Sequence, residues 1–309
     1  MTETYQDLPL ELFEPAQVDE KEKEHIAQPA MSALQDGWIR MRKNKGSVVS
    51  LVILIIIVLL AIFGPILSSY DYAKTNYTVT FQAPTREHIF GTDQFGRDQF
   101  ARIWYGTRIS LLIAFFAACI DIFIGVTYGA VSALAGGRVD AVMQRIIEIL
   151  VGIPSLIIII LLMMVMPAGI TSIIIALAIT GWVNMARLVR AQILKLKEQE
   201  FVLAARILGT SPRNIILKHL IPNTVGVIVI NAMFTIPSAI FTEAFLSFIG
   251  IGLSEPKASL GVLINNGYQV LHNFPYLLIF PAIVIILIMV CFSILGDGLR
   301  DALDPRMRK

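Results

Sequence analysis

Two carboxylates lie inside long apolar runs, and their positions raise the clearest chemical question in the sequence. Asp121 is near the middle of the run 109–135, and Glu243 lies within the run 223–250. An ionised Asp at the centre of a bilayer costs at least ~2.5 kcal/mol on insertion scales, so it must face a partner helix or a wet cavity. On a transport path such a group would meet a cationic part of the substrate. The alternatives are an interhelical hydrogen bond or, for Glu243, a position that water reaches.

Other residues that could carry chemistry are not gathered into motifs. The sequence has no G-x-x-x-x-G-K-[ST], no G-x-S-x-G and no H-E-x-x-H pattern. Both cysteines, Cys119 and Cys291, lie in apolar runs, as small buried side chains do. The histidines are scattered along the chain: His25, His88, His219 and His272. We therefore expect no catalytic residue, no metal site and no cofactor bound by this chain, which is not expected to be an enzyme.

A charged interval between two apolar runs has the pattern of a short helix. Residues 187–222 carry seven Lys/Arg and two Glu, and Phe201, Ala204, Ala205 and Leu208 recur at the spacing of one helical face. Gly209 follows directly, where a helix would end. A short helix with small residues, presented on a membrane loop, is suited to docking in a groove of a partner. The alternative is an ordinary cytoplasmic loop whose basic residues only set orientation.

The composition indicates a membrane protein, in which transmembrane helices position these residues. The chain is 56% hydrophobic and 16% charged, with a mean hydropathy of +0.71 and a net charge of +2. Its apolar runs predict an all-α polytopic protein with six transmembrane helices in one permease domain, 47–309. The expected spans are about 47–67, 109–135, 146–166, 170–188, 223–250 and 275–296, with the charged loop at 189–222. We expect a lipid bilayer around the chain, and no nucleic acid as a partner.

The segments before the first span differ in charge. Residues 1–30 carry eight carboxylates and two lysines, which predicts a flexible acidic cytoplasmic tail. Residues 31–46 turn basic and contain Trp38, which predicts an amphipathic helix at the membrane interface. With six spans, the proposed inner side holds 19 Lys/Arg and the outer side six. This asymmetry follows the positive-inside rule and places both termini in the cytoplasm.

The loop after the first span contains the sequence GTDQFGRD at positions 91–98. Glycines permit tight turns, and Asp and Arg side chains can satisfy backbone groups and one another. We predict a structural clasp in the outer loop rather than a ligand site. Its residues are Gly91, Asp93, Gly96, Arg97 and Asp98.

Three motifs together carry a resemblance to a known family. Leu203-Ala204-Ala205, three residues, Gly209 and then Ile221-Pro222 resembles the EAA loop of ABC-importer permeases, with Leu203 where the Glu usually stands. GTDQFGRD at 91–98 and GDGLRDALDP at 296–305 are similar to signatures of the peptide/nickel branch of that family. The resemblance covers residues 31–309.

The resemblance implies a type I ABC-importer permease fold and an inner-membrane subunit that moves but does no chemistry. Its expected partners are a homologous second permease, two cytoplasmic ATPase subunits that bind ATP and Mg, and an extracytoplasmic substrate-binding protein. The residues expected to couple to the ATPase are Glu200, Phe201, Ala204, Ala205, Arg206, Leu208 and Gly209. Asp121 and Glu243 are the candidates for the translocation path.

The expected substrate is a peptide, with an oligopeptide favoured over the alternatives of a dipeptide or nickel. The tract Glu243-Ala244-Phe245-Leu246-Ser247-Phe248 resembles permeases of peptide importers and supports this choice. Two further classes remain as alternatives. One is an ion-coupled secondary carrier that uses Asp121 as its proton site. The other is a membrane scaffold or sensor without transport.

Overall fold

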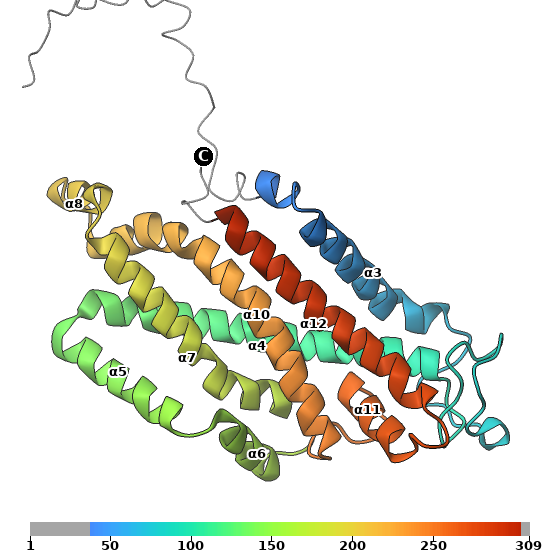
Figure 1. Cartoon of the computed structure of the whole chain (residues 1–309). Coiled ribbons are helices and arrows are strands. Elements are labelled where there is room, and N and C mark those ends of the chain that lie inside the picture. The colour runs from blue at the N-terminus through green and yellow to red at the C-terminus, as the bar shows by residue number, and fades with distance from the viewer. Residues whose placement is uncertain (1–37, 304–309) are drawn as a thin grey trace, which may run out of the picture.

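The computed structural model describes residues 38–303, and in this part of the chain the architecture is helical (Figure 1). The predicted acidic tail, 1–30, lies outside the described residues. Of the predicted interfacial helix, 31–46, only the end is described, where residues 38–41 are helical. The longer helices are α3 (Lys45–Leu67), α4 (Gln99–Ala135), α5 (Gly137–Gly152), α6 (Ser155–Val165), α7 (Ile170–Lys197), α10 (Ile221–Phe248), α11 (Leu260–Gln269) and α12 (Tyr276–Leu303). The shorter ones are η2 (Tyr77–Val79), α8 (Glu200–Ile207), α9 (Pro212–Asn214) and η3 (Ile215–Leu220).

Five helical stretches in residues 38–303 are long and apolar enough to cross a membrane. These are Lys45–Leu67, Gln99–Ala135, Ile170–Lys197, Pro212–Phe248 and Tyr276–Leu303. The sixth expected span, 146–166, is not one straight helix. It lies in the pair α5 and α6, which are bent by 80° at their junction, so the pair makes a sixth span only if the two helices cross together.

The break between α5 and α6 has a cause in the sequence. Pro154 follows Ile153, whose backbone is extended, and α6 begins at the next residue. A residue before proline is disfavoured in the helical region, and proline has no N–H to continue the hydrogen-bond ladder. Before Pro222, by contrast, the chain stays helical. Ile221 keeps a helical backbone and donates its N–H to the carbonyl of Ile216 five residues back, a π-helical hydrogen bond in η3.

Helices α4 and α7 share the most extensive contact of the described bundle, and small residues line it. Gly125 and Gly129 form a G-x-x-x-G pattern on α4. A Cβ added at Gly129 would lie 2.4 Å from the carbonyl oxygen of Ala186, and one at Gly125 would lie 2.6 Å from Cβ of Met185. The two backbones therefore approach closely, and α7 fixes the orientation of α4.

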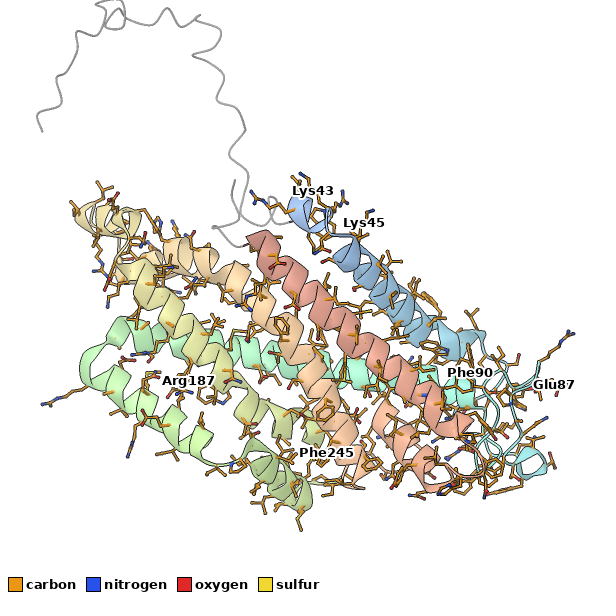
Figure 2. The ribbon with its side chains drawn as sticks, in the orientation of Figure 1. Lys43, Lys45, Glu87, Phe90, Arg187 and Phe245 are labelled. Carbon is orange, nitrogen blue, oxygen red and sulfur yellow. The ribbon has the colours of Figure 1, made fainter. Side chains whose placement is uncertain are left out.

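Different segments of the chain lie at the two ends of the helical bundle (Figures 1 and 2). The start of α3 meets the last turns of α12, where Ser47 packs on Gly298, and Leu303 lies against Gly226 of α10. Helix α8 projects at this end, and Lys43 and Lys45 lie there as well. At the opposite end lie the 68–98 loop, with Glu87 and Phe90, and the short helix α11.

Candidate functional site

A polar cavity of about 440 Å³ opens between four elements of the bundle. Its walls are α4, the α5–α6 break, α7 and α10. Asp121 contributes a carboxylate from α4, and Gly181 lies in the wall that α7 forms. The other polar lining residues are Ser155, Thr180, Asn184, Asn231, Thr235, Ser238 and Thr242. The kink at Ile153 and Pro154 is part of this wall, so the broken helix shapes the cavity.

Asp121 lines this cavity, and one of its carboxyl oxygens, Oδ1, is buried without a hydrogen-bond partner among residues 38–303. The residue is 4% exposed. The carboxyl group lies against Gly181, where an added Cβ would be 2.1 Å from Oδ2. A buried polar atom without a partner is costly, so it indicates strain or a role toward a ligand.

Glu243 lies elsewhere in the bundle, and its place on the translocation path stays a prediction. It is 0% exposed and does not line the cavity. Its carboxyl oxygens accept hydrogen bonds from Ser110 Oγ at 2.7 Å and Ser247 Oγ at 2.8 Å. Ser110 also accepts from the backbone N–H of Leu260 at 3.3 Å. Glu243 thus ties together α4, α10 and α11, the interhelical alternative that the sequence had left open.

The five residues of the GTDQFGRD motif come together in one tight turn. Asp93 Oδ1 accepts from the backbone N–H of Phe95 and of Arg97, each at 2.9 Å, and Asp93 Oδ2 accepts from Arg97 Nε at 2.7 Å. Asp98 caps α4 by accepting from Ala101 N–H at 2.8 Å. Its other oxygen lies 2.8 Å from Nδ1 of His88.

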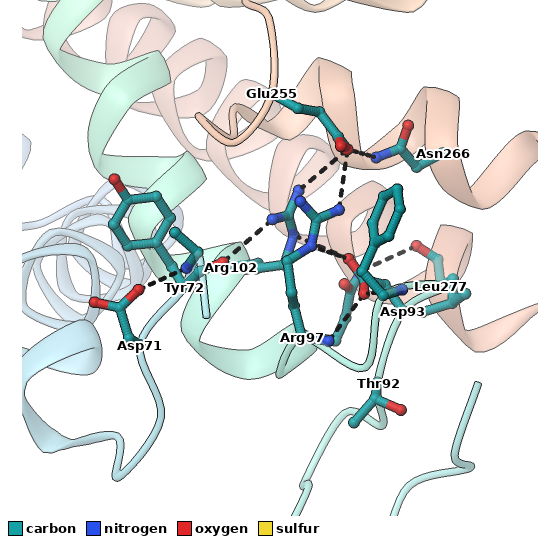
Figure 3. A network of polar contacts seen from close by, with 12 residues as sticks. Asp71, Tyr72, Thr92, Asp93, Arg97, Arg102, Glu255, Asn266 and Leu277 are labelled. Atoms are coloured by element: carbon teal, nitrogen blue, oxygen red, sulfur yellow. Dashed lines mark hydrogen bonds and ion pairs between the residues drawn. The ribbon is translucent and has the colours of Figure 1, made fainter. Parts of the chain in front are cut away.

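Arginines extend this turn into a network that joins segments far apart in sequence (Figure 3). Arg97 donates to Glu255 Oε1 at 3.0 Å, and Asn266 of α11 donates to the same oxygen at 3.2 Å. Arg102 is fully buried and donates to the carbonyl of Tyr72 at 3.2 Å. We call Asp93, Arg97, Arg102, Glu255 and Asn266 the outer clasp.

The clasp changes the acidity of its outermost member. Glu255 lies in the loop between α10 and α11 and is partly exposed. Partial burial by itself would raise the pKa of Glu255. The hydrogen bond from Arg97 and the charges of Arg97 and Arg102 outweigh that effect, so its pKa lies below the ordinary value. The carboxylate is therefore ionised whenever the clasp is formed near neutral pH.

Two glycines of the motif are required by the turn. Gly96 has φ +68°, and an added Cβ would lie 1.7 Å from the carbonyl oxygen of Asn76. Gly91 has φ +76°, and an added Cβ would lie 2.5 Å from the carbonyl oxygen of Gln82. Only glycine combines this backbone conformation with such a close approach.

Helix α8 contains most of the residues that the sequence analysis proposed for coupling, and it ends as expected at Gly209. Gly209 has φ +78°, its N–H donates to Arg206, and Thr210 N–H donates to Ala205. These two bonds are those of a Schellman motif, a common end of α-helices. Glu200 begins the helix, and Leu208 is its C-cap.

One face of α8 is held by the chain and the other is presented outward. Val202 is 0% exposed and packs with Ile193 of α7 and with Leu220. Ile207 and Leu208 are 86% and 84% exposed. Phe201, Ala204 and Arg206 are also exposed.

Ala205 differs from its expected placement. We predicted that it lies on the docking face with Ala204, but it is 8% exposed and turned toward the chain's own fold. Ala205 is three residues from Val202 and therefore lies next to it on the helix surface, at the border between the buried side and the side that carries Leu208. Ile207, which the sequence analysis did not include, takes the exposed place instead.

A second charged contact lies at the α8 end of the bundle, and the sequence analysis missed it. Arg190 of α7 donates from Nε to Asp140 Oδ1 at 2.7 Å and from Nη2 to Oδ2 at 2.5 Å. Ser132 of α4 bonds to the same carboxylate. The only sequence signal was a lone Asp in the first turn of a helix, because its partner is 50 residues away.

The sequence of this chain matches two known protein families. Residues 121–309 match the family described as "Binding-protein-dependent transport system inner membrane component". Residues 32–84 match the "N-terminal TM domain of oligopeptide transport permease C". The chain therefore belongs to the inner-membrane permeases of binding-protein-dependent ABC importers, and it is a multi-pass membrane protein.

Curated relatives lie in the peptide branch of this family. The chain is 47% identical over 304 residues to the oligopeptide transport system permease protein OppC of Bacillus subtilis, covering 98% of this chain and 100% of the relative. It is 46% identical to the dipeptide transport system permease protein DppC of the same organism, covering 99% and 96%. OppC of Escherichia coli is 40% identical, with 90% and 92% covered.

Solved structures show the fold. One crystal form of the inward-facing MetNI methionine ABC transporter aligns with a TM-score of 0.55 and 19% identity, covering 66% of this chain and 96% of that one. A second crystal form aligns with a TM-score of 0.53 over 64% and 94%. The fold is thus that of an ABC-importer permease. An ion-coupled carrier and a scaffold without transport find no support in these comparisons.

Proposed function

We propose that this protein is one permease subunit of an ATP-driven importer of peptides, with an oligopeptide as its main substrate. Relatives named for oligopeptide and for dipeptide transport align over nearly the whole chain at almost equal identity, which supports a peptide substrate. A homologous second permease would complete the path, and a binding protein would deliver the substrate from outside. Two partner subunits would bind ATP and Mg on the cytoplasmic side, where both termini of this chain also lie.

The observation that carries this proposal is the outward face of α8. Helix α8 and its C-cap project at one end of the bundle and expose Phe201, Ile207 and Leu208. Exposing these apolar side chains to water is costly unless another protein covers them. An ATPase subunit with an apolar groove would cover it. When ATP closes the ATPase pair, α8 would move with it, and α7 and α10 would follow because they flank α8 along the chain.

The test is uptake by the complete importer in proteoliposomes loaded with ATP. We expect uptake of an oligopeptide such as tri-alanine that depends on ATP and on the binding protein, and weaker competition by dialanine or Ni²⁺. Stronger competition by dialanine or by Ni²⁺ would reassign the substrate. Uptake driven by a pH gradient without the ATPase subunits would contradict the proposal.

A substitution on α8 tests the coupling contact directly. In Ile207→Asp a charge replaces an exposed apolar side chain, so the loop keeps its own packing while the partner's groove meets a carboxylate. We expect co-purification of the ATPase subunits to weaken at least tenfold, which is about 1.4 kcal/mol. Arg213→Gln, an exposed change in the same loop outside α8, is the matched control. Normal coupling in Ile207→Asp would show that α8 is not the contact.

A further inference from the structure

Asp121 has no partner in the part of the chain that the structure describes, although it is nearly fully buried and faces a cavity large enough for a ligand. The cavity measures about 440 Å³, within the range of small-molecule sites. Oδ1 of Asp121 has no hydrogen bond from residues 38–303. Among these residues the lining contains one carboxylate and no Lys, Arg or His. A carboxylate held in this way is left for a group that arrives from outside the chain.

Three further polar groups of the lining are placed to accept hydrogen bonds. Thr235 donates its hydroxyl proton to the carbonyl of Asn231 at 3.0 Å, and Thr242 donates to that of Ser238 at 2.9 Å. Asn231 donates from its amide to the sulfur of Met185. Because these protons are directed into the helix walls, the oxygen lone pairs of the same groups remain for the cavity. These three groups can therefore accept hydrogen bonds from a ligand in the cavity.

Gly181 makes this arrangement possible. An added Cβ at Gly181 would collide with the carboxyl group of Asp121, so glycine allows the carboxylate to lie flat against α7. The close packing of α4 on α7 at Gly125 and Gly129 holds the two helices in this register. The carboxylate thus has a fixed position in the cavity wall.

We propose that Asp121, together with the acceptor oxygens of α7 and α10, forms a subsite for the ammonium group of a peptide substrate during its passage through the permease. An ammonium group brings one positive charge and three donors to one carboxylate and a set of oxygen acceptors. Ni²⁺ fits less well, because nickel is suited by imidazole and the lining offers carboxylate, hydroxyl and amide groups. The inference rests on the proposed function and adds to it the part of the substrate that this chain recognises.

The charge of the site is tested with a reporter cysteine. Thr235→Cys is placed in the complete importer, in a background where Cys119 and Cys291 are replaced by Ser. Labelling rates are compared for a cationic and an anionic methanethiosulfonate reagent. We expect Asp121→Asn to lower the cationic-to-anionic rate ratio about tenfold, the effect of one charge in the wall of the same partly wet cavity. Asp121→Glu keeps the charge and should keep the ratio.

Glu243→Gln is the matched control, because it removes a carboxylate of similar burial that does not line the cavity. We expect no change in the rate ratio from this variant. A ratio that is unchanged in Asp121→Asn, or one that falls equally in Glu243→Gln, would overturn the proposal.

Protection by peptides tests the chemistry without changing Asp121. We expect tri-alanine to slow labelling of Thr235→Cys, while N-acetyl-tri-alanine, which lacks the ammonium group, does not slow it. Equal protection by both peptides, or by neither, would overturn the ammonium site. ATP-dependent uptake measured on the same proteoliposomes separates the two hypotheses. Uptake without selective protection removes only the Asp121 site, whereas no ATP-dependent uptake of any peptide removes the proposed function.

Discussion

At the scale of single residues, the outer loop depends on glycines that no other residue can replace. In Gly96→Ala, positive φ alone costs roughly 1–2 kcal/mol, and the contact with Asn76 brings the expected loss of stability to roughly 2–5 kcal/mol. Gly209 also has a positive φ, but an added Cβ would meet no neighbouring atom, so for Gly209→Ala we expect only the loss of roughly 1–2 kcal/mol that positive φ causes. Gly152→Ala has neither and should be neutral. Thermal unfolding of the purified importer orders the three variants, and an equal effect of all three would contradict the geometry.

The outer clasp gives a second residue-scale prediction, for acid pH. The pKa of Glu255 is lowered in the folded protein, so its contribution to stability is present above the unfolded pKa of about 4.3 and is lost as the pH falls through the folded value. We expect wild type to melt above Glu255→Gln at pH 7, and this difference to shrink steadily below about pH 4.3. A difference that stays constant down to pH 3 would show that the carboxylate charge is not what Arg97 holds.

At the scale of elements, the α4–α7 contact should be the most sensitive in the bundle. Gly129→Leu puts a branched side chain where a Cβ would already lie 2.4 Å from the carbonyl of Ala186, so the helices must separate. We expect poor assembly of the importer and a low melting temperature. Thr127→Leu, on the exposed side of the same helix, is the control. Equal assembly of the two variants in size-exclusion chromatography would rule out this packing.

The sequence predicted the helical elements better than their internal breaks. Apolar runs separated by charge reveal spans, because hydropathy is summed over many residues. The bend in the third span depends on Pro154 alone, and proline also occurs within the continuous helices α10 and α12. Local pattern alone therefore did not distinguish a kink from a tolerated proline.

The two intramembrane carboxylates show the same limit for the site. Both looked alike in sequence, yet Glu243 is satisfied by Ser110 and Ser247 whereas Asp121 faces a cavity. The difference depends on Ser110, which is 133 residues from Glu243 and becomes its neighbour only when α4 and α10 pack. The turn at 91–98 was predictable because most of its bonds are local, and Glu255 was missed because its contacts to Arg97 are not.

At the scale of the whole molecule, α7 joins the proposed coupling surface to the cavity in one unbroken helix. From Gly181 in the cavity wall to Lys197 before α8 is about 24 Å at 1.5 Å per residue. A displacement of α8 would therefore reach the cavity as a movement of a rigid rod. Helix α4 is held to this rod by the close packing at Gly125 and Gly129. Helix α5 is tied to it at the α8 end by the contact of Arg190 with Asp140, whose carboxylate also receives Ser132 of α4.

Breaking this tie should separate ATP hydrolysis from transport. In Asp140→Asn the two charged hydrogen bonds from Arg190 are weakened, so α7 can move without carrying α5 along. We expect ATP hydrolysis stimulated by the binding protein to continue while peptide uptake per ATP falls several-fold. The exchanged pair, Asp140→Arg with Arg190→Asp, restores an ion pair with the two charges swapped. It should recover part of the uptake that either single substitution loses, because the effects of substitutions at two residues in contact do not add. If the losses simply add in the exchanged pair, Arg190 and Asp140 do not act together, and the cavity receives the movement of α8 through α7 alone.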